Sequence, residues 1–211
     1  MVQEIAQRVK RCVHRAVALA GVTACVSMLA QTGVAQALDV DDLQRVIDTK
    51  DCPGCNLGGA DLRRLDLTGA NLEGANLKNA NLFYAVLDGA NLSGADLRYA
   101  NLAYVSAAPI VGVGSDGEPV LTPAEFIEAD FENALMNYAD FSGADMVGAD
   151  FEEAYIFKTR FVGTQLQRTN FDVTFVHDVD LTDANLCGST YWGGNDYRRA
   201  CSNVPISDLE E

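Results

Sequence analysis

The cysteines are the side chains of this sequence with the most reactive chemistry. Cys52 and Cys55 flank Pro-Gly, a spacing that suits a disulfide, a reversible redox dithiol or one half of a zinc site. No histidine follows Cys55, so the haem-attachment motif is absent, and no second pair of this spacing completes a zinc site. Cys187 and Cys201 lie near the end of the chain. The fold that holds these cysteines decides between the alternatives.

Residues suited to catalysis are scarce. Once a leader at residues 1–37 is set aside, His177 is the only histidine, and a lone histidine is usually an ordinary surface residue. The formal net charge of −15 argues against binding nucleic acid through its phosphates or docking on an anionic membrane. We therefore predict no catalytic residues, no metal site, no cofactor and no nucleic-acid partner, in a protein that is not an enzyme.

Residues 1–37 have the layout of a secretory signal peptide. A basic segment precedes an uncharged apolar run over residues 16–30, and Ala35-Gln36-Ala37 supplies the small residues of a cleavage site. The apolar run is shorter than the roughly 20 residues that span a bilayer, although an uncleaved anchor is the alternative. We expect cleavage after Ala37 and an exported protein with no membrane segment after cleavage. The four cysteines that remain suit an oxidising compartment.

A five-residue repeat dominates the rest of the chain. Ten consecutive units centred on leucine fill residues 55–104, and thirteen units centred mostly on phenylalanine, leucine or methionine fill residues 124–188. A period of five suits neither an α-helix, in which the central residues would spread around the axis, nor a flat strand, in which they would alternate between faces. Each unit must therefore contain a turn, and glycine at many fifth positions suits a corner with positive φ.

The units resemble the pentapeptide-repeat family, with its pattern Ala-(Asp/Asn)-Leu-x-x. The resemblance implies an all-β solenoid, a right-handed quadrilateral β-helix with four units in each coil. It also implies that the central residue and the preceding small residue point inward while the other positions point outward. Four consecutive units carry threonine at the small inward position, and we expect their hydroxyls to bond to the backbone: Thr159, Thr164, Thr169 and Thr174.

The segments around the repeats complete the predicted organisation. Residues 38–54 hold a short N-terminal capping helix, because Leu43, Val46 and Ile47 share one helical face after several aspartates, and they end within the Cys-Pro-Gly-Cys motif, whose last residue, Cys55, opens the first repeat. Residues 105–123 interrupt the repeat, and apolar stretches around Ser-Asp-Gly suggest a β-hairpin or a folded-out loop. Residues 189–211 form a C-terminal cap and tail.

The implied fold favours structural disulfides. A redox pair of the thioredoxin type belongs in a βαβ setting, whereas Cys52 and Cys55 open a β-helix. We expect Cys52 to pair with Cys55, and Cys187 with Cys201, since the two pairs would lie at opposite ends of the rod. A reversible redox pair at Cys52 and Cys55 is the alternative.

One outward surface departs from the repeat. Leu135, Tyr155 and Phe175 occupy the second position, 20 residues apart, where aspartate or asparagine is usual, and Phe157 and His177 lie beside them. We call these five residues the aromatic stripe. Exposed aromatic residues of this kind mark interfaces, so we predict that the stripe binds a partner. The alternative is that residues 105–123 cover it.

These features favour a non-catalytic exported scaffold or protein-interaction module, in the periplasm or, as in similar cyanobacterial proteins, the thylakoid lumen. Its partner would be an unknown protein or a second copy. One alternative is a DNA mimic that binds gyrase, as the quinolone-resistance members of the family do. Acidity suits that alternative, but a signal peptide does not. The other alternative is a thiol-redox-regulated protein that uses Cys52 and Cys55.

Overall fold

A computed structural model describes residues 39–190 of the chain. The predicted signal peptide lies outside these residues, as do all but the first two residues of the predicted C-terminal cap. Within residues 39–190, no helix has both the length and the apolar character needed to cross a membrane.

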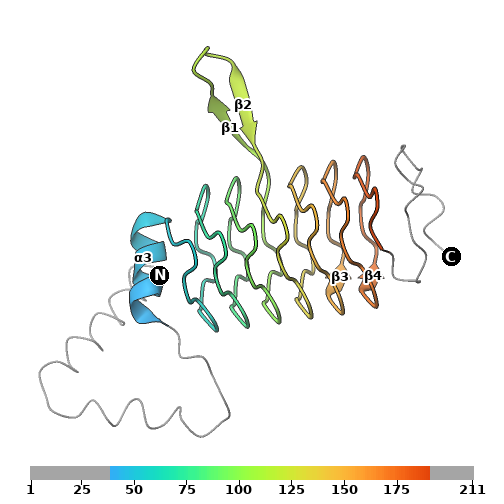
Figure 1. Ribbon diagram of the computed structural model, residues 1–211, viewed down its shortest axis with the longest axis horizontal. Helices are drawn as coiled ribbons and strands as arrows, with labels where there is room; N and C mark the ends of the chain where they lie inside the picture. The colour runs from blue at the N-terminus through green and yellow to red at the C-terminus, as the bar shows by residue number, and fades with distance from the viewer. Residues whose placement is uncertain (1–38, 191–211) are drawn as a thin grey trace, which may run out of the picture. The chain divides into compact units, whose positions relative to one another are not determined.

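The described chain winds into a four-sided parallel β-helix (Figure 1). Each side pairs with the side one coil away, for instance Asn56 with Asn76 and Asn76 with Asp96, at a separation of 20 residues. Asn76 N donates to the Cys55 carbonyl and Leu77 N donates to the Asp96 carbonyl, both at 2.8 Å. Every five-residue side thus carries hydrogen bonds in both directions along the axis, which satisfies the backbone groups that the coil buries.

Each corner depends on two features of the repeat. The fifth residue adopts positive φ, as at Gly74 (62°) and Asn79 (59°), which confirms the expected turn. The aspartate or asparagine at the second position accepts a hydrogen bond from the backbone two residues later. Asn81 Oδ1, for example, accepts from Phe83 N at 3.2 Å, and Asp130 Oδ1 accepts from Glu132 N at 3.0 Å. The repeat prefers these two residue types because their side chains close the turn.

The core contains the central residues and the small residues before them. The central leucines of the first run and the central phenylalanines of the second run are almost completely buried. The four buried threonines bond to backbone carbonyls, as expected: Thr164 donates to Phe141 and Thr174 to Phe151, each at 2.8 Å. Thr159 donates to the Met136 carbonyl and Thr169 to that of Leu166. The hydroxyl layer is therefore fully satisfied.

The coil extends beyond both predicted boundaries of the first run. Asp51 pairs with Asn71, so Cys52 occupies the central position of an earlier unit. Ser106 pairs with both Val86 and Asp140, and Ala107 is fully buried in a central position. The predicted insert of residues 105–123 was therefore wrong at its start, because Ala107 is too small to be recognised as a core residue by its type. The coil resumes with Glu125 paired to Asn91.

Only a few elements are regular helices or strands. Helix α3 spans Val40–Thr49, with Asp39 accepting hydrogen bonds from the N–H groups of Asp41 and Asp42 at its start. Strands β1 (Ile110–Val113) and β2 (Pro119–Thr122) form an antiparallel hairpin, which projects from the middle of the coil stack (Figure 1). Strands β3 (Tyr155–Phe157) and β4 (Phe175–His177) pair in parallel on one side of the coil.

Candidate protein-interaction surface

The aromatic stripe lies on the side of the coil that contains β3 and β4. Tyr155 pairs with Phe175 in the strand register, and their rings stack with centroids 4.7 Å apart. Phe157 and His177 stack in the same way at 5.5 Å. Leu135, Tyr155 and Phe175 are 40%, 46% and 57% exposed. The structure therefore brings the five predicted residues together on one outward surface.

A stack of tyrosines at the adjacent corner extends this surface. Tyr84, Tyr104 and Tyr138 occupy equivalent corner positions in three successive coils, with centroid separations of 4.6 Å and 4.9 Å. Tyr138 also meets Phe157 edge-on at 5.4 Å. The sequence prediction missed the stack because it omitted the unit centred on Ala107. That omission assigns Tyr138 to a different side of the coil from Tyr84 and Tyr104.

Ring orientation limits what this surface can bind. The stacked tyrosines are nearly parallel, with interplanar angles of 13° and 6°. Their faces are therefore in contact with one another along the coil axis, and their edges and hydroxyls point outward. Sugars and nucleobases bind aromatic residues through the ring faces. Aromatic edges with hydroxyl groups instead suit the mixed apolar and polar contacts of a protein interface.

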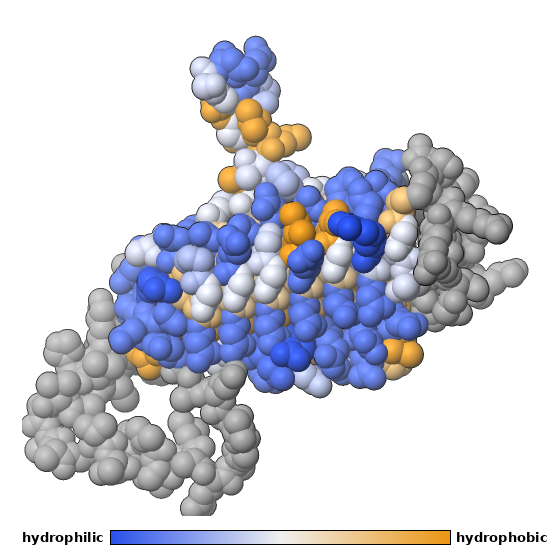
Figure 2. Space-filling view, viewed as in Figure 1, coloured by the Kyte–Doolittle hydropathy of each residue, from blue (hydrophilic) through white to orange (hydrophobic). Residues whose placement is uncertain are grey.

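The hairpin does not cover the stripe, so that alternative was wrong. We call residues 110–123 the arm. Its side chains are themselves exposed, including Val111 (71%) and Val113 (79%). Hydrophobic residues lie on the lower part of the projecting arm, whose tip is hydrophilic, while the visible coil surface is largely hydrophilic apart from a small hydrophobic patch near the arm (Figure 2). The arm is therefore a second exposed apolar surface.

The base of the arm, which consists of Ile110 and the preceding residues 106–109, packs closely on the neighbouring coils. A Cβ atom added to Gly89 would lie 2.6 Å from Ile110 Cγ1, and one added to Gly143 would lie 2.8 Å from Pro109 Cγ. Asp88 Oδ1 accepts from Ser106 Oγ at 2.6 Å and from Ala108 N at 2.9 Å. These contacts hold the base of the arm against the coil.

The side of the coil that carries Asp96, Asp130 and Asp150 differs in charge compensation before and after the arm. Arg98 bonds to Asp96 at 2.6 Å and approaches Asp130 at 3.3 Å, and the Arg98 hydrogen bond lowers the pKa of Asp96. Burial, together with the nearby carboxylates of Asp96 and Asp150, raises the pKa of Asp130. Burial and neighbouring acids also raise the pKa of Glu152. On this side of the coil, acidic groups thus repel one another after the arm, whereas Arg98 compensates Asp96 before it.

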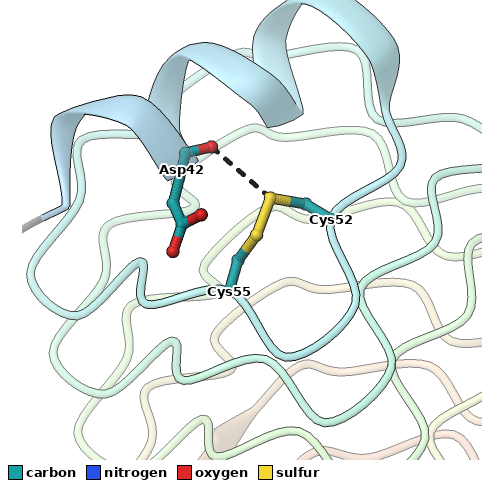
Figure 3. A group of neighbouring side chains, drawn as sticks. All are labelled: Asp42, Cys52 and Cys55. Atoms are coloured by element: carbon teal, nitrogen blue, oxygen red, sulfur yellow. Dashed lines mark hydrogen bonds between the residues drawn. A yellow bond between two sulfur atoms is a disulfide. The ribbon is translucent and has the colours of Figure 1, made fainter.

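The cysteine pair lies between α3 and the first coil (Figure 3). The sulfurs of Cys52 and Cys55 are within bonding distance, the Cα atoms are 5.4 Å apart, and both residues are buried. Arg45 Nε donates to Cys52 Sγ at 3.1 Å, and the Arg45 guanidinium also contacts Cys55 Sγ. Cys52 Sγ lies 3.4 Å from the Asp42 carbonyl oxygen.

These contacts disfavour metal binding at the cysteine pair. The Asp42 carboxylate and the two sulfurs lie within 4.8 Å of one another, but they supply three ligands where structural zinc takes four. The Arg45 cation beside the sulfurs would oppose a second cation there. Cys187 is half-buried in the last described coil. Its predicted pairing with Cys201 stays a prediction, because Cys201 lies outside the described residues.

Sequence comparison identifies the class of this β-helix. Eight copies of the pentapeptide repeats profile match, over residues 51–82, 75–106, 124–161 and 136–172. The chain belongs to the pentapeptide-repeat family, whose members form right-handed quadrilateral β-helices and are generally non-enzymatic structural modules. No curated protein matches the sequence.

Solved structures of the family resemble this chain. HetL, a pentapeptide repeat protein involved in heterocyst differentiation regulation in the cyanobacterium Nostoc, is 26% identical with a TM-score of 0.50. The match covers 69% of this chain and 65% of HetL. QnrB1, a plasmid-mediated fluoroquinolone resistance protein, is 20% identical over 67% of this chain and 72% of its own, with a TM-score of 0.36. A thylakoid-lumen protein of Arabidopsis thaliana is 20% identical over 67% and 90%, with a TM-score of 0.25.

Proposed function

We propose that this protein is a non-catalytic, exported interaction module that binds a protein partner through the aromatic stripe. The observation that carries the proposal is the exposure of Leu135, Tyr155 and Phe175 at a position where the repeat mostly uses aspartate or asparagine. Aspartate and asparagine at this position close the turn of their own unit by accepting a backbone hydrogen bond, as Asp130 does. The side chains of Leu135, Tyr155 and Phe175 have no oxygen that can do so. The stripe therefore forgoes a turn-closing hydrogen bond for a surface that favours contact.

Replacing Tyr155 and Phe175 by aspartate tests this proposal. Aspartate is native to the second position, so the coil should fold, while the stripe gains two charges. We expect at least 2 kcal/mol of binding free energy to be lost, or about a 30-fold weaker partner affinity. The measurement is crosslinking capture from the extracytoplasmic fraction of expressing cells, followed by titration of the identified partner against the purified variants.

A matched control separates the stripe from a general effect of charge. Gln165 and Asn185 pair at the second position of a different side. The Gln165→Asp/Asn185→Asp variant adds the same two charges there, and it should bind as the wild type does. If the stripe variant retains the partner, or if the control loses it equally, the stripe is not the interface.

Export is the second component of the proposal. The charged segment, apolar run and Ala-Gln-Ala site of residues 1–37 support it. We expect the mature protein to begin at Leu38 and to occupy the periplasm or the thylakoid lumen. N-terminal sequencing that returned Met1, with the protein in the cytosol, would contradict export and favour the gyrase-binding alternative. Inhibition of purified gyrase by the protein would then be the decisive assay.

We further propose that Cys52 and Cys55 form a structural disulfide beneath a capping helix, and not a redox pair. Leu43 and Val46 of α3 are buried in the same core cluster as both cysteines, and Asp42 Oδ2 accepts from Asn56 N at 2.8 Å. Helix α3 thus packs on the first coil, whose edge would otherwise be open to water. Sulfurs buried this deeply are poorly accessible to thiol exchange. A free thiol at either cysteine in the purified, unreduced protein would contradict the disulfide.

A further inference from the structure

One corner of the coil carries a continuous line of large side chains. It lies between the side with β3 and β4 and the next side, and we call it the corner column. All its members are exposed, and φ lies between 53° and 61° at each of them: Arg64, Tyr84, Tyr104, Tyr138, Lys158 and Asp178.

The residue types in the corner column are conformationally costly. Two other corners use mainly glycine at this position, such as Gly74 and Gly94 on one and Gly69 and Gly163 on the other. The fourth corner also has few glycines, since most of its positive-φ residues carry side chains: Asn79, Tyr99, Asn133, Glu153 and Val173. The left-handed conformation is unfavourable for residues with a Cβ, by roughly 1–2 kcal/mol each. None of the six members of the corner column is glycine. The fourth corner shares this cost in part, and the corner column differs from it because its large side chains contact one another along the axis.

Contacts within the corner column make it one ordered surface. The tyrosine rings stack from Tyr84 through Tyr104 to Tyr138. Lys158 Nζ lies 5.9 Å from the Tyr138 ring centroid and 3.8 Å from the Asp178 carboxylate. The column therefore has a cation at one end, tyrosines in the middle, and a lysine followed by an anion at the other end.

This order is self-complementary when one copy is reversed. If Tyr104 of one copy lies opposite Tyr138 of another, then Tyr84 lies opposite Lys158 and Arg64 lies opposite Asp178. Each of the three contacts is favourable: the edges of Tyr104 and Tyr138 make apolar contact, the Tyr84 hydroxyl oxygen can accept a hydrogen bond from the Lys158 ammonium group, and Arg64 meets the opposite charge of Asp178. Both copies repeat the coil at about 4.8 Å, so the contacts stay in step along the axis. A two-fold interface requires this kind of matching.

We propose that the corner column is a homodimer interface in which two copies lie antiparallel, related by a two-fold axis between Tyr104 of one copy and Tyr138 of the second copy. The proposal rests on the proposed interaction function and names one partner, a second copy of this chain. Overall charge supports the choice of surface. Because the protein carries a net charge of −15, two copies repel through most of their surface, and the column offers paired opposite charges instead.

Sedimentation velocity of the purified protein over about a hundredfold range of concentration tests the dimer. We expect the wild type to shift from the monomer mass to twice that mass. The Tyr104→Gly/Tyr138→Gly variant should weaken dimerisation by about tenfold or more. Glycine suits the positive φ of both corners, so this variant should be at least as stable as the wild type, and the loss cannot be attributed to unfolding.

Tyr99 provides the matched control. It is 49% exposed with φ of 60°, at a corner position on a different line of the coil. Tyr99→Gly makes the same chemical change outside the corner column and should leave dimerisation unchanged. If Tyr99→Gly weakens the dimer as much as the double variant does, the interface lies elsewhere.

A charge exchange tests the antiparallel arrangement. Arg64→Asp alone and Asp178→Arg alone should each weaken the dimer, because each opposes like charges between copies. The R64D/D178R variant restores opposite charges across the two-fold axis and should recover dimerisation. A wild type that stays monomeric throughout, or a double exchange that fails to recover, would overturn the proposal. The proposed function would remain intact if the wild type is monomeric and binds a different protein, and if the Tyr155→Asp/Phe175→Asp variant no longer binds that protein.

Discussion

The inner ladder on one side of the coil changes its residue type at the arm. Leu57, Leu77 and Leu97 occupy it before the arm. After the arm it continues as Phe131, Phe151 and Phe171, whose rings stack at 4.9 Å and 4.8 Å. The coil geometry is the same in both regions, since Asp96 pairs with Asp130 across the change. The repeat thus constrains the backbone more strictly than it constrains the volume of the core.

The surfaces of the two regions also differ in their residue types. Before the arm, Arg63 pairs with Asp61 and Arg98 with Asp96. After the arm, Arg160 pairs with Asp140 and Lys158 with Asp178, but carboxylates also lie close together around Asp130 and the aromatic stripe is exposed. The first region therefore resembles a conventional repeat without an aromatic stripe. The second region combines a heavier core, a buried threonine layer and the surface features that we associate with binding.

The largest expected effect tests the phenylalanine ladder. Phe151→Ala should destabilise the protein by about 3–5 kcal/mol, against about 2–5 kcal/mol for Leu77→Ala at the equivalent position in the first region. We expect the phenylalanine variant to lose about 1 kcal/mol more, because Phe151 stacks with both neighbours. Urea unfolding followed by circular dichroism measures both. If Leu77→Ala loses as much unfolding free energy as Phe151→Ala, or more, ring stacking adds no stability.

A smaller effect tests the threonine layer, which the first region lacks. Thr164→Ala removes the hydroxyl that donates to the Phe141 carbonyl, which also accepts from Ala144 N at 3.0 Å. Because that carbonyl keeps one partner, we expect a loss of about 1 kcal/mol in unfolding free energy. Thr164→Ser retains the hydroxyl and should lose less. Equal losses in the two variants would assign the effect to the methyl group instead.

The smallest effect concerns pH. Asparagine can close the same turn as aspartate, so Asp96→Asn and Asp130→Asn change charge and not fold. The pKa of Asp96 is lowered, so its stabilising contribution is present above the unfolded value near 3.8 and is lost as pH falls through the folded pKa. The pKa of Asp130 is raised, so its charged form costs stability at neutral pH, and that cost disappears as pH falls.

Urea unfolding of these two variants at pH 7 and well below pH 3.8, where the Asp96 carboxylate is protonated in the folded protein as well, distinguishes the regions. At pH 7, Asp96→Asn should destabilise and Asp130→Asn should be neutral or stabilising, each by less than about 1 kcal/mol because the pairs are partly exposed. Both differences from the wild type should shrink in acid. Shifts of the same sign at pH 7 would contradict the proposed contrast between the regions.

Much of the fold could be predicted because the repeat is a strict local rule. Ala at the first position, Leu or Phe at the third and Gly or Asn at the fifth each have one role in a coil of four units, and those roles recur without interruption over residues 55–104. The buried threonines and their carbonyl partners followed from the same rule. The residues of the aromatic stripe could also be found, because they lie together after the arm.

The tyrosine stack could not be found in this way. Its members lie on both sides of the arm, and their alignment depends on how many units the coil completes before the chain leaves it. Ala107 completes one more unit without a large side chain, and only the pairing of Ser106 with Val86 and Asp140 reveals it. One unit is a quarter of a coil, so the omission moves every later residue to the next side.

The sequence by itself therefore determined the repeat, the inward and outward positions and the presence of an interruption, but not the residue at which it begins. The tertiary structure decided which residues before and after the interruption share a side or a corner. The physical reason is that inward and outward positions depend on contacts within one unit. Alignment along the axis depends instead on backbone hydrogen bonds between coils, such as Tyr104 N to the Asn137 carbonyl, which any residue type can make.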